Sequence, residues 1–222
     1  MNTFELLKIG STILKEKKIA SSNLDSEILL SEVLKKNRQY LLRNLSQKIH
    51  KKHFINYSNL IKRRSNHEPV AYILKKKEFW SKFFYVTKDT LIPRPETELM
   101  VDKIIKKFKY KKNISILDIG TGSGCIIISL LSELDDSIGV GIDISNRALK
   151  IAEKNAIYHC VDKRIKFLNI SFSKYINKKF DLIVCNPPYI SRREFQCLSD
   201  DIKKFEPRIA LDGGNDGLDL IK

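Results

Sequence analysis

The 222-residue sequence contains no uninterrupted run of about 18 apolar residues, and its first ten residues lack the pattern of a secretory signal peptide. We therefore expect a soluble, cytoplasmic protein that does not enter a membrane. Cysteine is scarce: the four thiols form no C-x-x-C pair and have no histidine at metal-ligand spacing. These absences favour reduced thiols over disulfides or a zinc site. We expect no metal and assign no chemistry to the four histidines.

Acidic side chains are few relative to basic ones: 26 Asp and Glu against 41 Lys and Arg give a formal charge of +15. A positive excess of this kind favours nucleic-acid binding. The lysines, however, are scattered in short runs, and the sequence has the Lys, Ile and Asn bias of AT-rich coding DNA. We favour this compositional origin of the charge, and an approach to an RNA-rich partner such as the ribosome stays open.

Glycine occurs only nine times, but three of the nine stand together in Gly120-Thr121-Gly122-Ser123-Gly124, directly after the apolar segment 114–119. Glycines at the end of a strand let the backbone approach a ligand closely. Cys125 stands where a dinucleotide-binding G-x-G-x-x-G motif has its last glycine, and no G-x-x-x-x-G-K-[ST] motif occurs. About twenty residues further on, segment 138–143 ends in Asp143, an acid that can accept hydrogen bonds from both ribose hydroxyls of an adenosine.

A second motif, Asn186-Pro187-Pro188-Tyr189, follows the apolar segment 180–185. Its prolines fix φ and remove two N–H donors, so the loop offers carbonyl acceptors with few competing donors. With the Asn186 amide and the flat Tyr189 ring, it suits the binding of a planar –NH2 group. If this motif stood alone, two prolines that merely end a strand would be the better interpretation. The glycine loop and Asp143 upstream instead favour a functional site.

In this order, the glycine loop, the acid and Asn-Pro-Pro-Tyr resemble the class I S-adenosylmethionine-dependent methyltransferases. More narrowly, the sequence resembles the PrmC/HemK family, the N5-glutamine methyltransferases of peptide chain release factors. The resemblance covers nearly the whole chain and implies S-adenosyl-L-methionine as cofactor and the glutamine of the release factors' Gly-Gly-Gln loop as the methylated residue. It also extends to segments 78–80, 84–86, 91–98, 205–207 and 210–218.

We expect an α/β fold, with a Rossmann-like parallel sheet preceded by a small helical domain and a β-hairpin linker. Apolar spacing near 3.6 predicts helices through residues 1–70, one of them capped by Asn23, and the resemblance implies that this domain helps to bind the protein substrate. Aromatic alternation predicts the hairpin within 71–92, where the family usually has glycine in place of Lys75.

Strand–helix alternation then predicts a parallel sheet with right-handed crossovers, and the resemblance implies that residues 93–222 form the methyltransferase domain. The resemblance implies that its first four strands lie in the order three, two, one, four. The expected strands are 115–119, 139–143, 166–169 and 181–185, and the expected helices are 124–134 and 146–158.

The family continues after segment 217–222 with further helices and strands that would cover one side of the strand before Asn186. We therefore expect a truncated gene product or an incomplete record, in which the uncovered strand is an aggregation liability.

The resemblance assigns cofactor binding to the glycine loop, Asp143, Asn186 and Phe172. Phe172 stands in a stretch that flanks the adenine in many members, although the acid and tryptophan usual there are missing, and a core-packing role is the alternative. Asp118 either steadies the glycine loop or accepts from the cofactor's ammonium. A helix cap ahead of Ser145 is the alternative for Asp143. The cofactor residues are Gly120, Thr121, Gly122, Ser123, Gly124, Asp143, Phe172 and Asn186.

Asn186, Pro187 and Tyr189 are the expected catalytic residues, and together with Pro188 they form the substrate loop. Methyl transfer is an in-line displacement that needs mainly orientation. The side-chain oxygen of Asn186 and the carbonyl of Pro187 would accept the two amide hydrogens, while Tyr189 packs on the amide plane. The segment from Arg94 to Glu98 lines the substrate entrance or forms a salt-bridged loop, and both readings stay open.

Two alternatives remain at this point. Adenine-N6 methyltransferases of DNA or RNA use the same loop for the same reason, and the positive charge favours them. The helical domain and the Arg-Pro-Glu-Thr-Glu stretch favour a protein substrate. The second alternative is an inactive, truncated family member. We expect a monomer that acts on release factors and takes no nucleic acid as direct substrate.

Overall fold

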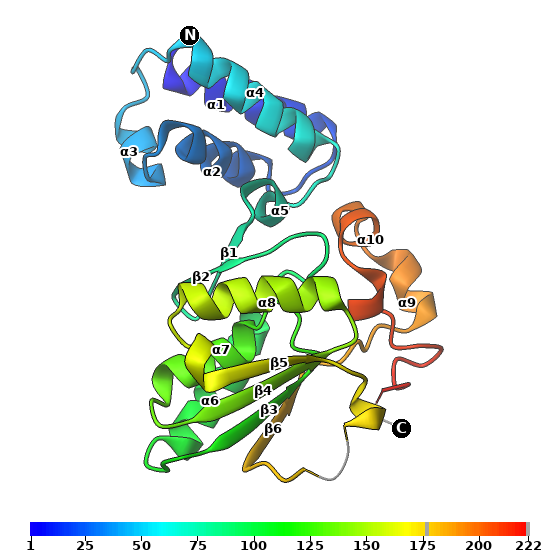
Figure 1. The fold of residues 1–222 in the computed structure, drawn as a ribbon. Coiled ribbons are helices and arrows are strands. Elements are labelled where there is room, and N and C mark those ends of the chain that lie inside the picture. Colours follow the sequence, from blue (N-terminus) through cyan, green and yellow to red (C-terminus); the bar gives the residue numbers. More distant parts are fainter. Residues whose placement is uncertain (176–177, 221–222) are drawn as a thin grey trace. The chain divides into compact units, whose positions relative to one another are not determined.

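The computed structural model describes residues 1–175 and 178–220, so the C-terminal bound of the expected methyltransferase domain, residue 222, lies outside the described residues. The chain divides into two compact units, Met1–Leu74 and Lys75–Lys222 (Figure 1). Within the described ranges, no helix is both long and apolar enough to cross a membrane.

The first unit is built from helices, as predicted. The capping box between Asn2 and Glu5 starts the first helix. Asn23 was expected to cap the second helix, and this prediction is wrong: the helix begins at Ser22. Its start depends instead on Asp25, which is buried and accepts hydrogen bonds from Ser21 and Arg64. The helices are α1 (Thr3–Glu16), α2 (Ser22–Leu34), α3 (Arg38–Arg43), α4 (Lys51–Ser65) and α5 (Val70–Leu74).

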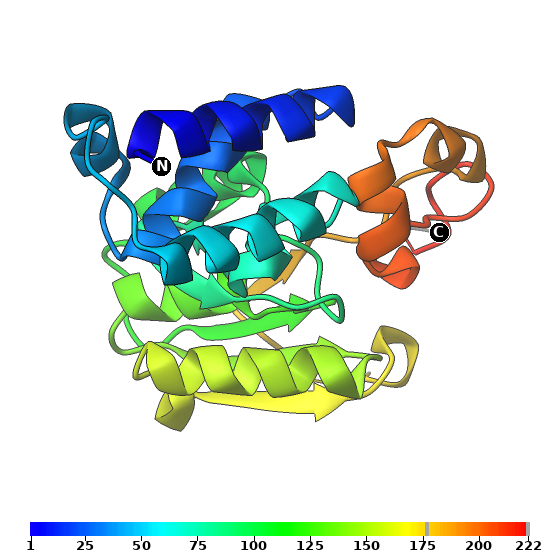
Figure 2. The same cartoon turned by 90° about the horizontal axis from the view of Figure 1, so that it is seen from above.

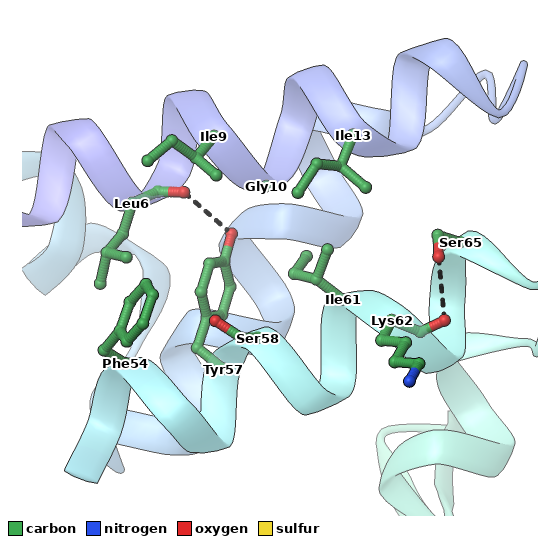
Figure 3. A pocket seen from close by; sticks show the side chains of 10 residues that line it. All are labelled: Leu6, Ile9, Gly10, Ile13, Phe54, Tyr57, Ser58, Ile61, Lys62 and Ser65. Atoms are coloured by element: carbon green, nitrogen blue, oxygen red, sulfur yellow. Dashed lines mark hydrogen bonds between the residues drawn. The ribbon is translucent and has the colours of Figure 1, made fainter. Parts of the chain in front are cut away.

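Helices α1 and α4 approach closely at Gly10 and Tyr57, where they also line a shallow apolar pocket (Figure 3). Tyr57 is 2% exposed, and its hydroxyl lies 2.6 Å from the Ser26 hydroxyl and 3.3 Å from the Leu6 carbonyl oxygen. Burial raises the pKa of Tyr57 to about 12. The phenol is thus held neutral inside the helical core, where it donates to the Leu6 carbonyl.

The second unit opens with the predicted hairpin of β1 (Lys76–Phe79) and β2 (Lys82–Tyr85), which pair antiparallel. The turn residues Trp80 and Ser81 have φ of 52° and 53°, the left-handed geometry of a two-residue hairpin turn. Residues 71–74, expected in the hairpin linker, belong instead to α5. Pro69 precedes that helix, and its carbonyl accepts from the Tyr72 and Ile73 N–H groups.

The parallel sheet has the order β5-β4-β3-β6, which confirms the predicted order of its first four strands. β3 matches the expected strand 115–119, and each of the other three strands begins within one residue of its expected start, because short apolar segments mark all four strands in the sequence. The strands are β3 (Ser115–Ile119), β4 (Ile138–Asp143), β5 (Ile165–Asn169) and β6 (Leu182–Cys185).

One face of this sheet is covered by α6 (Glu98–Phe108), α7 (Cys125–Glu133) and α8 (Asn146–Tyr158), whose apolar side chains share one core with the hairpin and strands. Figure 2 shows α8 running alongside β5. The opposite face carries a smaller cluster around Leu117, Ile119 and Ile142. The short helices α9 (Arg192–Cys197) and α10 (Asp200–Phe205) lie beyond the carboxyl ends of the strands (Figure 1). The single-turn 3-10 segments are η1 (Pro95–Thr97), η2 (Asp162–Arg164), η3 (Phe172–Lys174) and η4 (Arg208–Ala210).

Candidate functional site

The four strands run parallel, and the direction in which successive strands are added to the sheet reverses at β3. The chain continues from β3 to β4 and β5 on one side, whereas β6 returns to pair with β3 on the other side. Loops that leave such a switch point diverge and open a crevice at the carboxyl ends of the strands. A hollow lies at this place, lined by the loops after β3, β4, β5 and β6 and by residues ahead of α6. Sequence-predicted residues that line it are Gly120, Thr121, Gly122, Ser123, Asp143, Phe172, Asn186 and Pro188.

The glycine loop has open space above its backbone. Gly120 has φ +69°, and a Cβ built on it would meet no atom within 4 Å. The N–H groups of Gly120 and Thr121 both donate to the Ile142 carbonyl, at 2.9 and 3.0 Å, which ties the loop to β4. The loop is therefore a fixed, uncovered cradle in which main-chain atoms can contact a ligand directly.

Asp118 supports the loop from beneath. It is 1% exposed, does not line the hollow, and accepts a hydrogen bond of 2.7 Å from the Thr121 hydroxyl. Burial, partly offset by that hydrogen bond, raises the pKa of Asp118 to about 7. Of the two roles considered for Asp118, this geometry favours steadying the loop.

Gly124 lies at the other end of the loop and does not line the hollow. Its φ is +78°, and a Cβ there would lie 2.8 Å from Cδ1 of Ile128 and 3.2 Å from Cβ of Ala152. Gly124 thus lets α7 begin close against α8, a packing requirement distinct from the open backbone at Gly120. Cys125, the next residue, lines the hollow, and burial raises the pKa of its thiol to about 12, so it is protonated.

Asp143 ends β4 and faces the hollow. Its two carboxylate oxygens accept from the N–H groups of Gly122, at 2.9 Å, and Ser145, at 2.8 Å. The cap of α8 is Ser145 itself, whose side chain accepts from Ala148 N–H. Asp143 is therefore held in place by two backbone donors, and each carboxylate oxygen retains a lone pair for a hydroxyl group. Phe172, in η3, is 46% exposed and lines the same hollow.

The Asn186 loop joins this hollow to a second one. Asn186 lines both, Pro188 lines the first, and Pro187 and Tyr189 line the second. Tyr189 is 64% exposed. With the exception of Gly124, the predicted residues therefore line two adjoining hollows, and Asn186 lies at their junction.

The segment that supports the Asn186 loop was missed as a functional element by sequence reasoning. Ile190 N–H donates to the Leu211 carbonyl at 3.0 Å, and Gly213 N–H donates to the Ile190 carbonyl at 2.9 Å. A Cβ on Gly213 would lie 2.7 Å from the Pro188 carbonyl oxygen. The returning chain thus packs directly on the loop, and the Gly213-Gly214 pair was the available signal.

Arg94 also lines both hollows and forms a 2.6 Å ion pair with Glu206, whose side chain is 2% exposed. Glu96 lines the second hollow, whereas Glu98 accepts from Trp80 N–H and lines neither. The Arg94–Glu98 segment therefore contains both an ion pair and a wall of the site. Throughout the described residues, no three His, Cys, Asp or Glu side chains are grouped to hold a metal.

Comparison with known proteins gives a consistent result. The PrmC N-terminal domain family matches residues 5–74, and the methyltransferase small domain family matches residues 95–203. The release factor glutamine methyltransferase of Buchnera aphidicola subsp. Baizongia pistaciae is 42% identical over 210 residues, which cover 94% of this chain and 75% of that protein. The release factor glutamine methyltransferase of Clostridium botulinum is 38% identical over 217 residues, covering 96% of this chain and 77% of that protein.

Among solved structures, the hMettl16 catalytic domain has a TM-score of 0.50 at 17% identity, covering 62% of this chain and 53% of that one. At this identity the likeness concerns the fold alone, and it agrees with the predicted Rossmann-like methyltransferase architecture.

Proposed function

The chain belongs to the release factor glutamine methyltransferase family, and we propose that it transfers a methyl group from S-adenosylmethionine to the side-chain amide nitrogen of a release factor glutamine. The methylated residue is the glutamine of the Gly-Gly-Gln loop. The protein acts as a cytoplasmic monomer, and nucleic acid is not its substrate. In this proposal the helical unit 1–74 helps to bind the release factor, residues 75–92 form a linker that contains the hairpin, and 93–222 carry the chemistry.

The residues around the first hollow fit the cofactor. The uncovered backbone at Gly120 and Gly122 accommodates the methionine end, as the absence of any atom within 4 Å of a Gly120 Cβ supports. Asp143, fixed by its two backbone donors, accepts from the ribose hydroxyls. Phe172 supplies an apolar contact for the adenine. Bound S-adenosylmethionine supplies an electrophilic methyl group on a positively charged sulfur.

The Asn186 loop orients the nucleophile. An amide nitrogen is a weak nucleophile because its lone pair is delocalised into the carbonyl. The side-chain oxygen of Asn186 and the main-chain oxygen of Pro187 accept its two N–H hydrogens and direct the nitrogen toward the first hollow. Tyr189 packs against the amide plane. Because methylation itself acidifies the nitrogen, its departing proton needs no strong base beforehand, and the side chains mainly provide position.

The single observation that carries this proposal is the place of Asn186, which lines both hollows. A side chain at that junction can hold the substrate amide in the second hollow while the nitrogen of that amide faces the cofactor in the first hollow. Neither hollow alone would bring a protein side chain and a cofactor together.

Mass spectrometry of a purified release factor, incubated with the protein and S-adenosylmethionine, tests the proposal. We expect a mass gain of one methyl group on the peptide that contains the Gly-Gly-Gln sequence. Asn186→Ala should abolish this gain with little loss of cofactor binding by calorimetry, because the glycine loop, Asp143 and Phe172 remain to hold the cofactor. Gln196→Ala removes a side-chain amide from an exposed position of α9, outside both hollows, and is the matched control.

Methylation of RNA or DNA by the protein, with no mass gain on the release factor, would favour the adenine methyltransferase alternative. Near-normal turnover of Asn186→Ala would reject the proposed role of the loop. Size-exclusion chromatography with light scattering tests the monomer.

A further inference from the structure

Among the described residues that line the first hollow, Arg94 is the only one with a basic side chain. The acidic side chains there are Asp89 and Asp143. Asp143 reaches the hollow from the end of β4, whereas Arg94 belongs to the loop ahead of α6. The hollow thus receives its negative and positive charges from different elements, and a ligand with charges of both signs can match them.

Arg94 is held by a buried partner. Oε1 of Glu206 accepts from Nη2 of Arg94 at 2.6 Å, and Oε2 of Glu206 accepts from Ile92 N–H at 3.1 Å. The Glu206 side chain is 2% exposed, and the free-energy cost of removing its carboxylate from water is offset by these two donors. The pair fixes the guanidinium relative to the main chain that forms the wall of the hollow.

The guanidinium has unused donors. It carries five N–H groups, and the contact with Glu206 is its one hydrogen bond found within the described ranges. The Arg94 side chain remains 31% exposed where it borders the hollows. Its free edge is therefore available to an anionic group in a fixed orientation.

We propose that Arg94, oriented by Glu206, binds the carboxylate at the methionine end of S-adenosylmethionine; this inference rests on the cofactor assigned under the proposed function. The cofactor carries two positive groups, the sulfonium and the ammonium, and one negative group, the carboxylate. A guanidinium repels the first two and matches the geometry of the third with paired hydrogen bonds. Arg94 thereby selects the orientation of the methionine end over the glycine loop.

The second hollow does not offer Arg94 a better partner. The proposed substrate group there is a neutral amide whose two N–H hydrogens need acceptors, and a guanidinium has none. Asn186 and Pro187 line that hollow and supply such acceptors. The charge of Arg94 is therefore better matched by the cofactor than by the substrate.

Isothermal titration calorimetry with two ligands tests this assignment without turnover. The ligands are S-adenosylhomocysteine and its decarboxylated analogue, which keeps the adenosine, the thioether and the amine. Arg94→Gln should weaken S-adenosylhomocysteine binding by about 10- to 100-fold, the range expected for a charge-assisted hydrogen bond, and should change the Kd of the analogue by less than about twofold. The affinity of Arg94→Lys for S-adenosylhomocysteine should lie between those of the wild type and Arg94→Gln, because lysine keeps the charge but lacks the planar, two-pronged donor geometry of arginine.

Glu206→Gln should weaken S-adenosylhomocysteine binding by a smaller factor than Arg94→Gln does, because Arg94 remains but loses its fixed orientation. Arg193→Gln removes the same charge from an exposed position outside both hollows and should leave both ligands unaffected. Unchanged binding of the analogue also verifies that a variant is folded.

Equal weakening of both ligands by Arg94→Gln would overturn the inference in favour of a role in folding. Unchanged binding of both ligands, with a raised KM for the release factor, would overturn it in favour of substrate recognition. If the wild-type protein binds neither ligand, the proposed function fails and this inference fails with it.

Discussion

Gly10 of α1 lies directly against the hydroxyl group of Tyr57 in α4, so that a Cβ built on Gly10 would be 1.9 Å from the tyrosine oxygen (Figure 3). That oxygen is fixed by its 2.6 Å contact with the Ser26 hydroxyl. The hydroxyl network and the missing side chain are therefore two parts of one packing arrangement between α1, α2 and α4.

Gly10→Ala should destabilise the first unit although alanine is the better helix former. The gain in helix propensity is about 1 kcal/mol, whereas inserting a methyl group into a packed core costs about 1–3 kcal/mol, and the fixed Tyr57 cannot easily move aside. Hydrogen exchange of the α1 and α4 amides measures the change in opening free energy. It reports on this unit, unlike fluorescence of the sole tryptophan, Trp80, in the second unit.

Thr12→Ala is the matched control: Thr12 is an exposed residue of the same helix, and its replacement should gain about 0.5 kcal/mol, because alanine has the higher helix propensity and meets no packed neighbour there. Slower exchange in Gly10→Ala than in the wild type would show that the space beside Tyr57 is not required.

Lys75→Gly should stabilise the second unit. Lys75 has φ +56°, a left-handed conformation that costs a side chain about 1–2 kcal/mol and costs glycine almost nothing. The greater freedom of glycine in the unfolded chain offsets part of this gain, so a net gain of about 0.5–1 kcal/mol is expected. Urea unfolding followed by Trp80 fluorescence measures it, because Trp80 lies in the adjoining hairpin turn.

Lys77→Gly makes the same substitution within β1, where the backbone is extended, and should instead cost about 0.5–1 kcal/mol. The prediction is therefore that the two substitutions change the free energy of unfolding in opposite directions. A loss of stability at both positions would mean that the left-handed backbone at Lys75 carries no strain.

Local patterns predict much of this fold because they are properties of short segments. The apolar segment ahead of the glycine loop predicted β3, and the strand–helix alternation predicted α8, both with their observed bounds. The position of Lys75 was anticipated as one where the family uses glycine, and its positive φ supplies the physical reason.

Contacts between distant segments could not be predicted in this way. Arg94 and Glu206 are 112 residues apart in the sequence, and no local sequence pattern around either residue identifies the other as its partner. Similarly, Asn23 has the right residue type for a helix cap, but the helix that holds the buried Asp25–Arg64 pair of 2.7 Å already begins ahead of it. The Asn186 loop was recognisable in the sequence as a motif, whereas its packing against Gly213 required the tertiary structure.

Asp118→Asn should flatten the pH dependence of stability. In the unfolded chain the carboxyl titrates near its ordinary value of 3.8, and in the folded protein burial raises its pKa to about 7. Between these values the native state holds one more proton than the unfolded state, so wild-type stability falls as pH rises from about 4 to about 7. The contribution lost is on the order of 2–4 kcal/mol.

Urea unfolding of the wild type and Asp118→Asn at several pH values isolates this effect as a difference, because the other titrating groups are common to both proteins. The asparagine side chain cannot ionise, so the variant's stability relative to the wild type should increase toward pH values of about 8. A difference independent of pH would show that Asp118 keeps an ordinary pKa in the fold.

Gly120→Ala and Gly124→Ala should separate the two tasks of the glycine loop. Both positions have positive φ, so each substitution carries backbone strain of about 1–2 kcal/mol. At Gly120 the new methyl group meets open space in the hollow, so stability should fall only by that strain. S-adenosylhomocysteine binding should weaken by at least about tenfold, because the methyl group occupies space that the ligand needs.

At Gly124 the methyl group would contact Ile128 and Ala152, at 2.8 and 3.2 Å, and would push α7 away from α8. Overpacking adds about 1–3 kcal/mol to the strain, so this variant should be the less stable of the two. Its remaining folded fraction should bind the ligand more tightly than Gly120→Ala does, since the open backbone at Gly120 is retained. Thermal unfolding and calorimetry on the same samples give both quantities. If Gly124→Ala proved stable but unable to bind, the methyl group would have to act on the ligand itself, and the division between packing and binding within the loop would be wrong.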